Sequence, residues 1–466
     1  MPLLLSSTRA REAGEDPGPP FAVSLQARAE RTLKTSASAP VQLGILRPNA
    51  RSHKKLSHVQ LIRQRVLLTF LDPLPEQCLQ WQNLSTSQWR HLLRWLDYSG
   101  LALYFFDRIT ELQLGDLLPE PVFARLRQNL IDNTKRTRSM IAESIAIQQK
   151  FQATSLRYAA LKGLSFWPSS VPKQELRSQF DMDYLVAEKD VQAARGILER
   201  EGYRLYATNG RSWEFKRNEF PGISRIQMYK DTGSWAVELH VESSASSSPS
   251  QLERLEWRDL DGFRMPVLSP IDLFLGQGLH VYKHICSEFS RAAHLLEFRR
   301  HVLFHRDDAF FWNSLQSRAL ENPRSIVGLG VVTLLITQAM GEFAPESMTS
   351  WTVDRLPRSV QLWVETYGHR AVLGSFPGTK LYLLLQQEIE ALGLSSKRSV
   401  RQSLIPSGLP PPVIRASPNE SFSTRLGRYR MQLGLIFGRL RFHLVEGMRF
   451  AWESHRWRRQ LNLGAR

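Results

Sequence analysis

The stretch Phe180-Asp-Met-Asp-Tyr-Leu-Val186 decides the expected fold. Side chains alternate between the two faces of a strand, so Asp181 and Asp183 would point to one face and the apolar residues between and after them to the other. Two carboxylates so close together repel unless a cation lies between them. The stretch therefore predicts a buried strand that binds a divalent cation, for which magnesium is the natural candidate.

A second apolar stretch, Trp235 to Val241, repeats this pattern. Glu238 and His240 would share one face of a strand, while Trp235, Val237, Leu239 and Val241 would share the other. If this strand lies beside the first, Glu238 completes a three-carboxylate cluster of the kind that holds two metal ions about 3.5 to 4 Å apart. His240 would then flank the cluster.

Upstream of both strands, Leu161-Lys-Gly163 ends another apolar strand and precedes the stretch 164–167, which could begin a short helix. A glycine lets backbone amides approach an anion, and a helix N-terminus attracts phosphate. We expect Lys162 to neutralise a triphosphate and Arg177 to be a second phosphate contact. Two other roles stay open for Arg177, namely pairing with Glu175 and packing against Trp167.

A family resemblance becomes visible at these residues. The chain resembles the uncharacterised nucleotidyltransferases of the polymerase-β-like superfamily in Leu-Lys-Gly at 161–163, Arg177-x-x-x-Asp181-x-Asp183-x-Leu-Val186, Glu201-Gly-Tyr203 at a helix end, Val237-Glu-Leu-His240, and later His280-x-x-x-His284 with Arg291 and Glu297. The resemblance covers about 160 to 305. It implies an α+β fold, in which a small mixed-sheet nucleotidyltransferase core is embedded between helical N- and C-terminal regions.

The resemblance also implies an activity, the Mg²⁺-dependent transfer of a nucleoside monophosphate from an NTP, with ATP as the expected donor. Two Mg²⁺ ions, with Mn²⁺ as an alternative, would be held by Asp181, Asp183 and Glu238. Lys162 with Gly163 would occupy the place of the superfamily's Gly-Ser loop. The expected nucleotide-binding residues are Lys162, Gly163, Ser165, Arg177 and His240. The acceptor is an unidentified hydroxyl on a small molecule, a protein side chain or an RNA end.

Two other classes of function stay open. Phe180, at a position that is often small in such proteins, and the Lys-Gly pair favour a catalytically inactive nucleotide-binding scaffold of the same fold. The formal net charge of +17 is concentrated at the ends, since nine basic residues face four acidic ones in 1–55 and ten arginines face two glutamates in 421–466. These basic termini favour binding to nucleic acid or to an anionic surface.

Composition and periodicity predict the remaining organisation. We expect a disordered basic arm (1–55), a helical N-terminal domain (56–155), the nucleotidyltransferase core (156–266), a helical domain (267–400), a Pro-rich linker (401–424) and a basic amphipathic helix (425–466). Within the core, further strands are expected at Tyr158–Leu161, Trp213–Lys216 and Ile223–Tyr229, and a helix at Glu188–Glu201.

The last of these segments carries an apolar stripe along one helical face, and we expect that stripe to dock on the protein itself. Docking on an anionic membrane surface or on nucleic acid stays open. The stripe consists of Leu426, Tyr429, Leu433, Ile436, Leu440, Leu444, Met448 and Ala451.

Two further features bear on partners and location. His280 and His284 stand at i and i+4 on one helix face, as metal-binding histidines can, but the sequence shows no third ligand; zinc binding, substrate contact and plain packing all stay open. Only Cys78 and Cys286 are present, so a disulfide framework has no support. We find no apolar stretch long enough to span a bilayer and expect a cytoplasmic protein without a transmembrane segment.

Overall fold

The computed structural model describes residues 56–217, 227–233, 235–243, 249–394, 400–404 and 420–464. These residues all belong to one compact unit, His53–Arg466. The expected basic arm at 1–55 lies outside the described residues, as does most of the expected linker, at 405–419.

Helices open the described chain, and two of them begin with a capping box in which Ser57 or Ser85 accepts from the third backbone amide. Gly100, at φ +76°, ends the second of these helices. The elements are α2 (His58–Leu68), η1 (Glu76–Leu79), α3 (Thr86–Ser99), α4 (Ala102–Glu111), η2 (Gly115–Leu117) and the long α5 (Glu120–Ala153).

A seven-stranded mixed sheet follows, in the order β3-β4-β5-β2-β1-β7-β6. β2 pairs with β5, and β1 with β7, in parallel, while the other neighbours are antiparallel. The strands are β1 (Tyr158–Leu161), β2 (Asp181–Ala187), β3 (Arg204–Asn209), β4 (Ser212–Lys216), β5 (Ala236–Glu242), β6 (Leu255–Leu260) and β7 (Phe263–Leu268). The predicted α+β class with a small mixed sheet is therefore confirmed.

Several details of the sheet differ from expectation. The expected strand at 223–229 is absent from its described part, because Gln227 to Tyr229 form a turn closed by the bond from Lys230 N to Gln227 O; 223–226 lie outside the described residues. Strands β3, β6 and β7 were not predicted, and β7 runs to Leu268, beyond the expected core boundary at 266.

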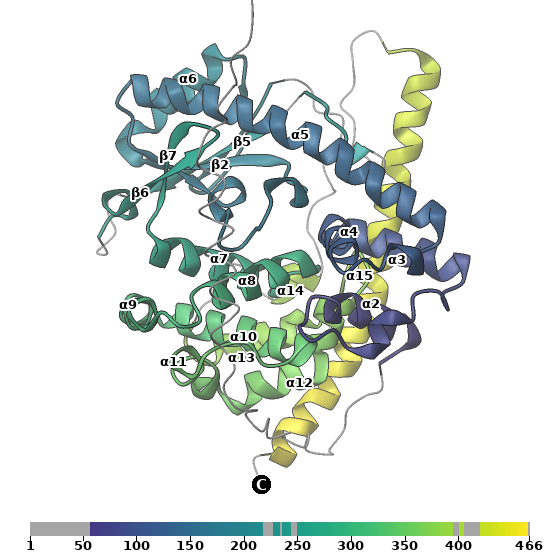
Figure 1. The fold of residues 1–466 in the computed structure, drawn as a ribbon. Helices are drawn as coiled ribbons and strands as arrows, with labels where there is room; N and C mark the ends of the chain where they lie inside the picture. Colours follow the sequence, from purple (N-terminus) through teal and green to yellow (C-terminus); the bar gives the residue numbers. More distant parts are fainter. Residues whose placement is uncertain are drawn as a thin grey trace, which may run out of the picture. The chain divides into compact units, whose positions relative to one another are not determined.

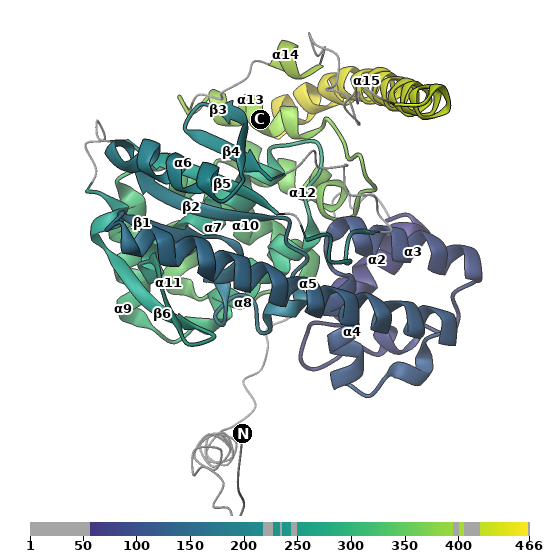
Figure 2. The ribbon, with the colours of Figure 1, turned by 90° about the horizontal axis from the view of Figure 1, so that it is seen from above.

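One face of the sheet is covered by α5 and by α6 (Val191–Arg200), as Figures 1 and 2 show. Met182, Tyr184 and Val186 of β2 are buried there together with Phe151 of α5 and Ile197 of α6. Burying this apolar face fixes the register of β2, since a slip by one residue would expose all three side chains. The aspartates of β2 consequently face the other side.

The C-terminal helices build a second layer on that other side. They are α7 (Pro270–Ile285), α8 (Ala292–Phe304), α9 (Ala309–Leu320), α10 (Pro323–Met340), α11 (Glu346–Thr349), η8 (Val353–Arg355), α12 (Arg358–Leu373), α13 (Tyr382–Glu390), α14 (Val400–Leu404) and α15 (Phe422–Gly464). Side chains of α2, α3 and α4 belong to the same apolar core as these helices. Arg63 Nη1 donates to Leu373 O at 2.7 Å, and Trp95 Nε1 to Gly374 O at 3.1 Å.

Helix α10 is long and apolar enough, by length and composition, to cross a membrane. Among the described residues it is the single helix of this kind, and the sequence analysis did not anticipate it. It packs against α7 and α12, and its Val331, Val332 and Ile336 are fully buried. These contacts are those of a core helix, and length and composition alone establish no membrane span.

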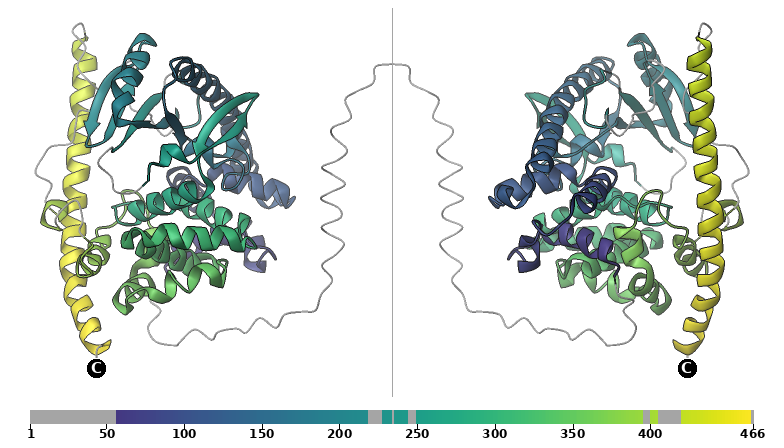
Figure 3. Two further views of the ribbon diagram at one scale, coloured as in Figure 1. Left: turned by 90° about the vertical axis from the view of Figure 1, so that its left-hand side faces the viewer. Right: turned by 90° about the vertical axis from the view of Figure 1, so that its right-hand side faces the viewer.

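Helix α15 docks on the protein with a face other than the predicted stripe. Phe450 and Trp457 are buried, and Glu446 and Glu453 accept hydrogen bonds from Thr379 and from Tyr367. The predicted stripe is largely exposed in the described part of the chain, for example at Leu426, Leu433, Leu440, Leu444 and Met448. Figure 3 shows α15 as one long helix beside the other C-terminal helices. The expectation that the stripe itself docks was wrong, because buried glutamates with hydrogen-bond donors define the docked face.

Candidate active site

Strand pairing brings the predicted acidic residues together. β2 and β5 are parallel neighbours in a register that places Asp183 beside Glu238, so the two side chains share one sheet face. β1 runs antiparallel to β2 with Leu161 opposite Asp183, and Lys162 follows directly at the end of that strand. Asp181 lies two residues before Asp183 on the same face.

The side chains of Asp183, Glu238 and His240 form a compact acidic cluster, with ligand atoms all within 4.8 Å of one another. Lys162 Nζ donates to Asp183 Oδ1 at 2.7 Å and lies 3.8 Å from Glu238 Oε2. His240 Nε2 lies 2.8 Å from Asp183 Oδ1 and 3.4 Å from Glu238 Oε2, and Ser212 donates to the other Glu238 oxygen. Lys162 and His240 thus each lie against both carboxylates.

These contacts shift the ionisation of the cluster. The hydrogen bond from His240, helped by that from Ser212, lowers the pKa of Glu238 well below its ordinary value. Burial lowers the pKa of His240, but its contacts with Asp183 and Glu238 outweigh burial and leave the pKa above 6.5. Burial alone would lower the pKa of Lys162. The negative charge of Asp183 and its hydrogen bond with Lys162 outweigh burial, so the pKa of Lys162 is raised. Glu238 is consequently an anion at neutral pH and Lys162 a cation.

Asp181 stands outside the compact acidic cluster and has a different environment. Burial, and then the negative charge of Asp183, raise the pKa of Asp181 from 3.8 to about 6. Its backbone carbonyl accepts from Gln179 Nε2 at 2.6 Å. Two like charges on one strand thus favour a protonated Asp181 at mildly acidic pH unless a cation is added between them.

The turn after β1 has an unusual backbone. Lys162 has φ +48° and Gly163 φ +31°, and a Cβ on Gly163 would lie only 2.0 Å from the Gln179 side chain. Glycine is therefore required where the turn meets Gln179. The stretch expected to begin a short helix forms the 3-10 turn η3 (Gly163–Phe166), and its Ser165 hydroxyl is buried and donates to Lys162 O at 2.7 Å. The Ser165 hydroxyl thus stabilises the turn at Lys162 and Gly163 through a hydrogen bond within the protein.

Arg177 is held by a partner that the sequence reading did not assign to it. Its Nε lies 3.1 Å from Glu297 Oε1, and its guanidinium lies over the Phe166 ring at 5.5 Å from the centroid. Tyr104 Oη also donates to Glu297, at 2.9 Å. Neither Glu175 nor Trp167, the two alternatives considered for Arg177, is the observed ion-pair or stacking partner, because the α8 glutamate comes from a distant part of the chain.

A small cleft opens over this face of the sheet. Its lining combines Lys162, Arg177 and Arg291 with the two β2 aspartates and three histidines of α7 and α8, namely His280, His284 and His294. Burial is the largest cause of the lowered pKa of His280, to about 2, and of His284, to about 4, and it lowers that of His294 as well. The cleft therefore combines cations, carboxylates and neutral imidazoles.

Gln179, Ser212 and His294 contribute to this site without having been singled out in the sequence. Gln179 and Ser212 are ordinary polar residues in it, and only the packing of the Gly163 turn and the pairing of β4 with β5 bring them to the cluster. For His294 a signal existed, since it follows His284 by ten residues at the start of the next helix.

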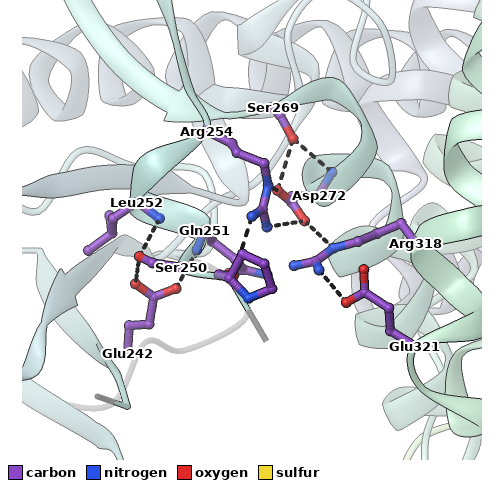
Figure 4. A network of polar contacts seen from close by, with 10 residues as sticks. Glu242, Ser250, Gln251, Leu252, Arg254, Ser269, Asp272, Arg318 and Glu321 are labelled. Atoms are coloured by element: carbon purple, nitrogen blue, oxygen red, sulfur yellow. Dashed lines mark hydrogen bonds and ion pairs between the residues drawn. The ribbon is translucent and has the colours of Figure 1, made fainter. Parts of the chain in front are cut away.

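A larger cavity, of about 860 Å³, lies further along the same face, where Leu185 and Ala187 of β2 line it. Asp272 of α7 stands at its wall and accepts from Arg254 Nε at 3.0 Å and from Arg318 Nε at 3.1 Å (Figure 4). Its volume is within the range of roughly 300–1,000 Å³ that is usual for small-molecule pockets. The sheet face that carries the carboxylates thus also offers, further along β2, space for an organic group.

Comparison with known proteins assigns the chain to a family. Its residues 85–324 match the family described as uncharacterised nucleotidyltransferase. No curated protein matches the sequence. A crystal structure of an antigenic nucleotidyltransferase-like protein from Paracoccidioides brasiliensis is 12% identical, over 46% of this chain and 97% of that one, with a TM-score of 0.27. Since the family match covers just over half of the 466 residues, the chain belongs to the uncharacterised nucleotidyltransferase family.

Proposed function

We propose that this protein transfers a nucleoside monophosphate from an NTP, with ATP as the expected donor, to a hydroxyl acceptor in a reaction that depends on Mg²⁺. Membership of the family supports nucleotidyl transfer in general terms. The observation that carries the finer proposal is the pairing of Asp183 with Glu238 on parallel neighbouring strands, on the face that also carries Asp181.

The donor set fits a magnesium ion. Carboxylate oxygens are the ligands that Mg²⁺ prefers, and those of Asp183 and Glu238 already lie within 4.8 Å of each other. Lys162 contributes a positive charge beside the same oxygens, which indicates that these carboxylates are stabilised by a cation. Asp181, Asp183 and Glu238 would hold the metal, which would polarise the phosphoryl group and favour ionisation of the acceptor hydroxyl.

The cations of the cleft support binding of a triphosphate. Lys162 follows the last residue of β1 and lines the cleft beside the carboxylates. Arg291 also lines the cleft, and its Nε has no hydrogen-bond partner among the described residues. Arg177 is paired with Glu297, so it contributes mainly by fixing the wall of the cleft. Lys162 and Arg291 would therefore neutralise phosphate charge and hold the NTP in line for transfer.

A labelling experiment tests the proposal. Purified protein is incubated with each α-³²P-labelled NTP, Mg²⁺ or Mn²⁺, and cell extract as the source of acceptors. We expect pyrophosphate release and transfer of label to protein, RNA or a metabolite, both abolished by EDTA and by Asp183→Asn. Label transfer that Asp183→Asn leaves at the wild-type rate would overturn the proposal, provided that circular dichroism shows the variant to be folded.

A catalytically inactive nucleotide-binding scaffold is the second candidate, and one observation favours it. Asp183 is already neutralised by Lys162 and His240 within the protein, so an added metal ion has to compete with both. This candidate predicts Mg²⁺-dependent NTP binding by calorimetry without pyrophosphate release from any acceptor pool. The labelling experiment separates the two candidates.

The exposed stripe of α15 supports a further proposal, contact with an anionic surface. Leu433, Leu440 and Met448 are exposed in the described part of the helix, and Arg439 and Arg441 are exposed close to them. Basic amphipathic helices bind anionic lipid in this way. Co-sedimentation with phosphatidylglycerol vesicles, but not with phosphatidylcholine vesicles, is the expected result, and equal binding to both would contradict it.

A further inference from the structure

Three histidines from two helices meet at the wall of the cleft opposite the sheet. His280 and His284 lie one turn apart on α7, and His294 lies in the first turn of α8. Each offers a nitrogen, and the three nitrogens lie within 4.8 Å of one another. This histidine cluster (His280, His284, His294) is separate from the acidic cluster, which uses carboxylates on the sheet.

The spacing of the rings is that of a metal centre. The centroids of His280 and His284 are 4.6 Å apart, those of His280 and His294 5.2 Å, and those of His284 and His294 4.9 Å. Imidazole nitrogens bind Zn²⁺ at about 2.0–2.1 Å in tetrahedral geometry, which puts ring centres about 5 Å apart. The three rings thus need little movement to surround one ion.

The environment of His294 gives an independent indication of a ligand. This side chain is only 7% exposed, and its Nδ1 is buried without a hydrogen-bond partner among the described residues. A buried nitrogen without a partner is unusual in folded proteins, because its lost hydration is not replaced. An ion held by the cluster would fix the orientation of this ring within the buried wall.

The charge state of the rings is suitable as well. Metal ions bind neutral imidazole, and burial keeps all three rings in that form at neutral pH. Arg291 and Arg177 line the same cleft and oppose a bare dication, while Asp181 and Asp183 favour it from the sheet. An anionic oxygen as the fourth ligand would offset the remaining positive charge.

From this geometry we infer that His280, His284 and His294 form a binding site for a zinc-type transition-metal ion. Three protein ligands leave the fourth position of a tetrahedral ion for water or for a substrate oxygen. Because the histidines line the same cleft as Asp181 and Asp183, that fourth ligand would lie beside the carboxylates. The acidic cluster would still take Mg²⁺, since nitrogen and oxygen donors select different ions.

Cobalt binding to the full chain tests the site without nucleotide, so the result is independent of nucleotidyl transfer. The protein is stripped of metal with a chelator, dialysed and titrated with Co²⁺, whose visible absorption is intense when the ion has four ligands. We expect one equivalent per chain with this absorption, displaced by Zn²⁺, and at least about tenfold weaker binding in His280→Gln and in His294→Gln.

Two matched variants identify the source of the signal. His91→Gln changes an exposed histidine of α3 and should leave Co²⁺ binding unchanged. Asp183→Asn removes a charge near the site but no ligand of the histidine cluster, so it should keep the four-coordinate absorption and weaken binding less than His280→Gln does. His294 is buried, and if circular dichroism shows that His294→Gln does not fold, the Co²⁺ affinity of His280→Gln tests the site by itself, because His280 is only half-buried. Wild-type affinity in a folded His280→Gln, no stoichiometric binding in the wild type, or loss of the absorption in Asp183→Asn would each overturn the inference.

Discussion

The acidic cluster on the sheet and the histidine cluster on the helices meet at one cleft, which Asp183 and the three histidines line, but they are built in opposite ways. In the acidic cluster, Asp183 contacts Lys162 and Glu238 contacts His240 within the protein. In the histidine cluster the rings are neutral, and His294 keeps a buried nitrogen without a partner in the described residues. If both clusters bind ions as proposed, charge would select the ion at the sheet and ring geometry would select it at the helices.

The largest expected effect is a loss of NMP transfer, which should differ between variants of the acidic cluster and variants of the histidine cluster. Asp183→Asn keeps the shape of the side chain but removes a charge from the acidic cluster. We expect NMP transfer to fall at least about 10³-fold, equivalent to several kcal/mol of transition-state stabilisation. His284→Gln is the control in the other cluster and should cost less than tenfold. An equal loss in both variants, measured by steady-state kinetics, would show that the clusters act as one site.

A second prediction concerns the wall that joins the clusters. Glu297 is only 2% exposed and accepts from both Arg177 and Tyr104. Glu297→Gln leaves the Arg177 cation unpaired in a buried position, and we expect the free energy of unfolding to fall by about 3 kcal/mol. Tyr104→Phe removes one hydrogen bond and should cost about 1 kcal/mol. Urea melts that rank the two variants the other way would contradict this account of the wall.

A third prediction asks whether Lys162 serves the substrate or only the carboxylates. Lys162→Met should raise the KM for NTP by roughly 10- to 100-fold, because a charge-assisted phosphate contact is lost. Lys135→Met changes an exposed lysine on α5 that lines neither cavity and should have little effect. A fall in kcat at constant KM would instead assign Lys162 to holding Asp183.

The smallest effect is a dependence of stability on pH in the metal-free protein. The pKa of Asp181 is raised from 3.8 to about 6, so the folded state binds its proton more tightly than the unfolded state. The stability that this proton contributes is present below about pH 4 and is lost as the pH rises through 6. In EDTA, Asp181→Asn should therefore gain on the order of 1–2 kcal/mol relative to wild type between pH 4 and pH 7. A constant difference across that range would contradict the assigned shift.

The sequence predicted that Asp181, Asp183 and Glu238 share one face of the sheet, and there is a physical reason for this success. The alternation of carboxylates with apolar residues in β2 and β5 has one structural solution, because a slipped register would turn the buried apolar side chains away from α5 and α6. β3 and β6 escaped prediction because they lack such alternation: every residue of β3 is exposed, and Trp257 of β6 is half exposed. The alternation of apolar and polar residues reveals which face of a strand is buried, and the edge strands β3 and β6 bury few of their side chains.

The histidine cluster and the docked face of α15 could not be predicted from the sequence in the same way. His294 joins His280 and His284 only through the packing of α8 against α7. On α15 the docked face contains Glu446 and Glu453, which hydropathy assigns to solvent, and their partners Thr379 and Tyr367 belong to other parts of the chain. Neither arrangement follows from the spacing of residues along one helix.

The bonds from Arg63 and Trp95 to the carbonyls at the end of α12 have a consequence for biosynthesis. They join residues about 300 positions apart, so α2 and α3 cannot complete their core until the ribosome has released residue 374. Gly100, which lines the cleft, belongs to this late-forming region. Non-local contacts of this kind slow folding and leave apolar surface open to chaperones. The part of the cleft that Gly100 lines would then be completed only after residue 374 has been released, when the whole sheet has already been made.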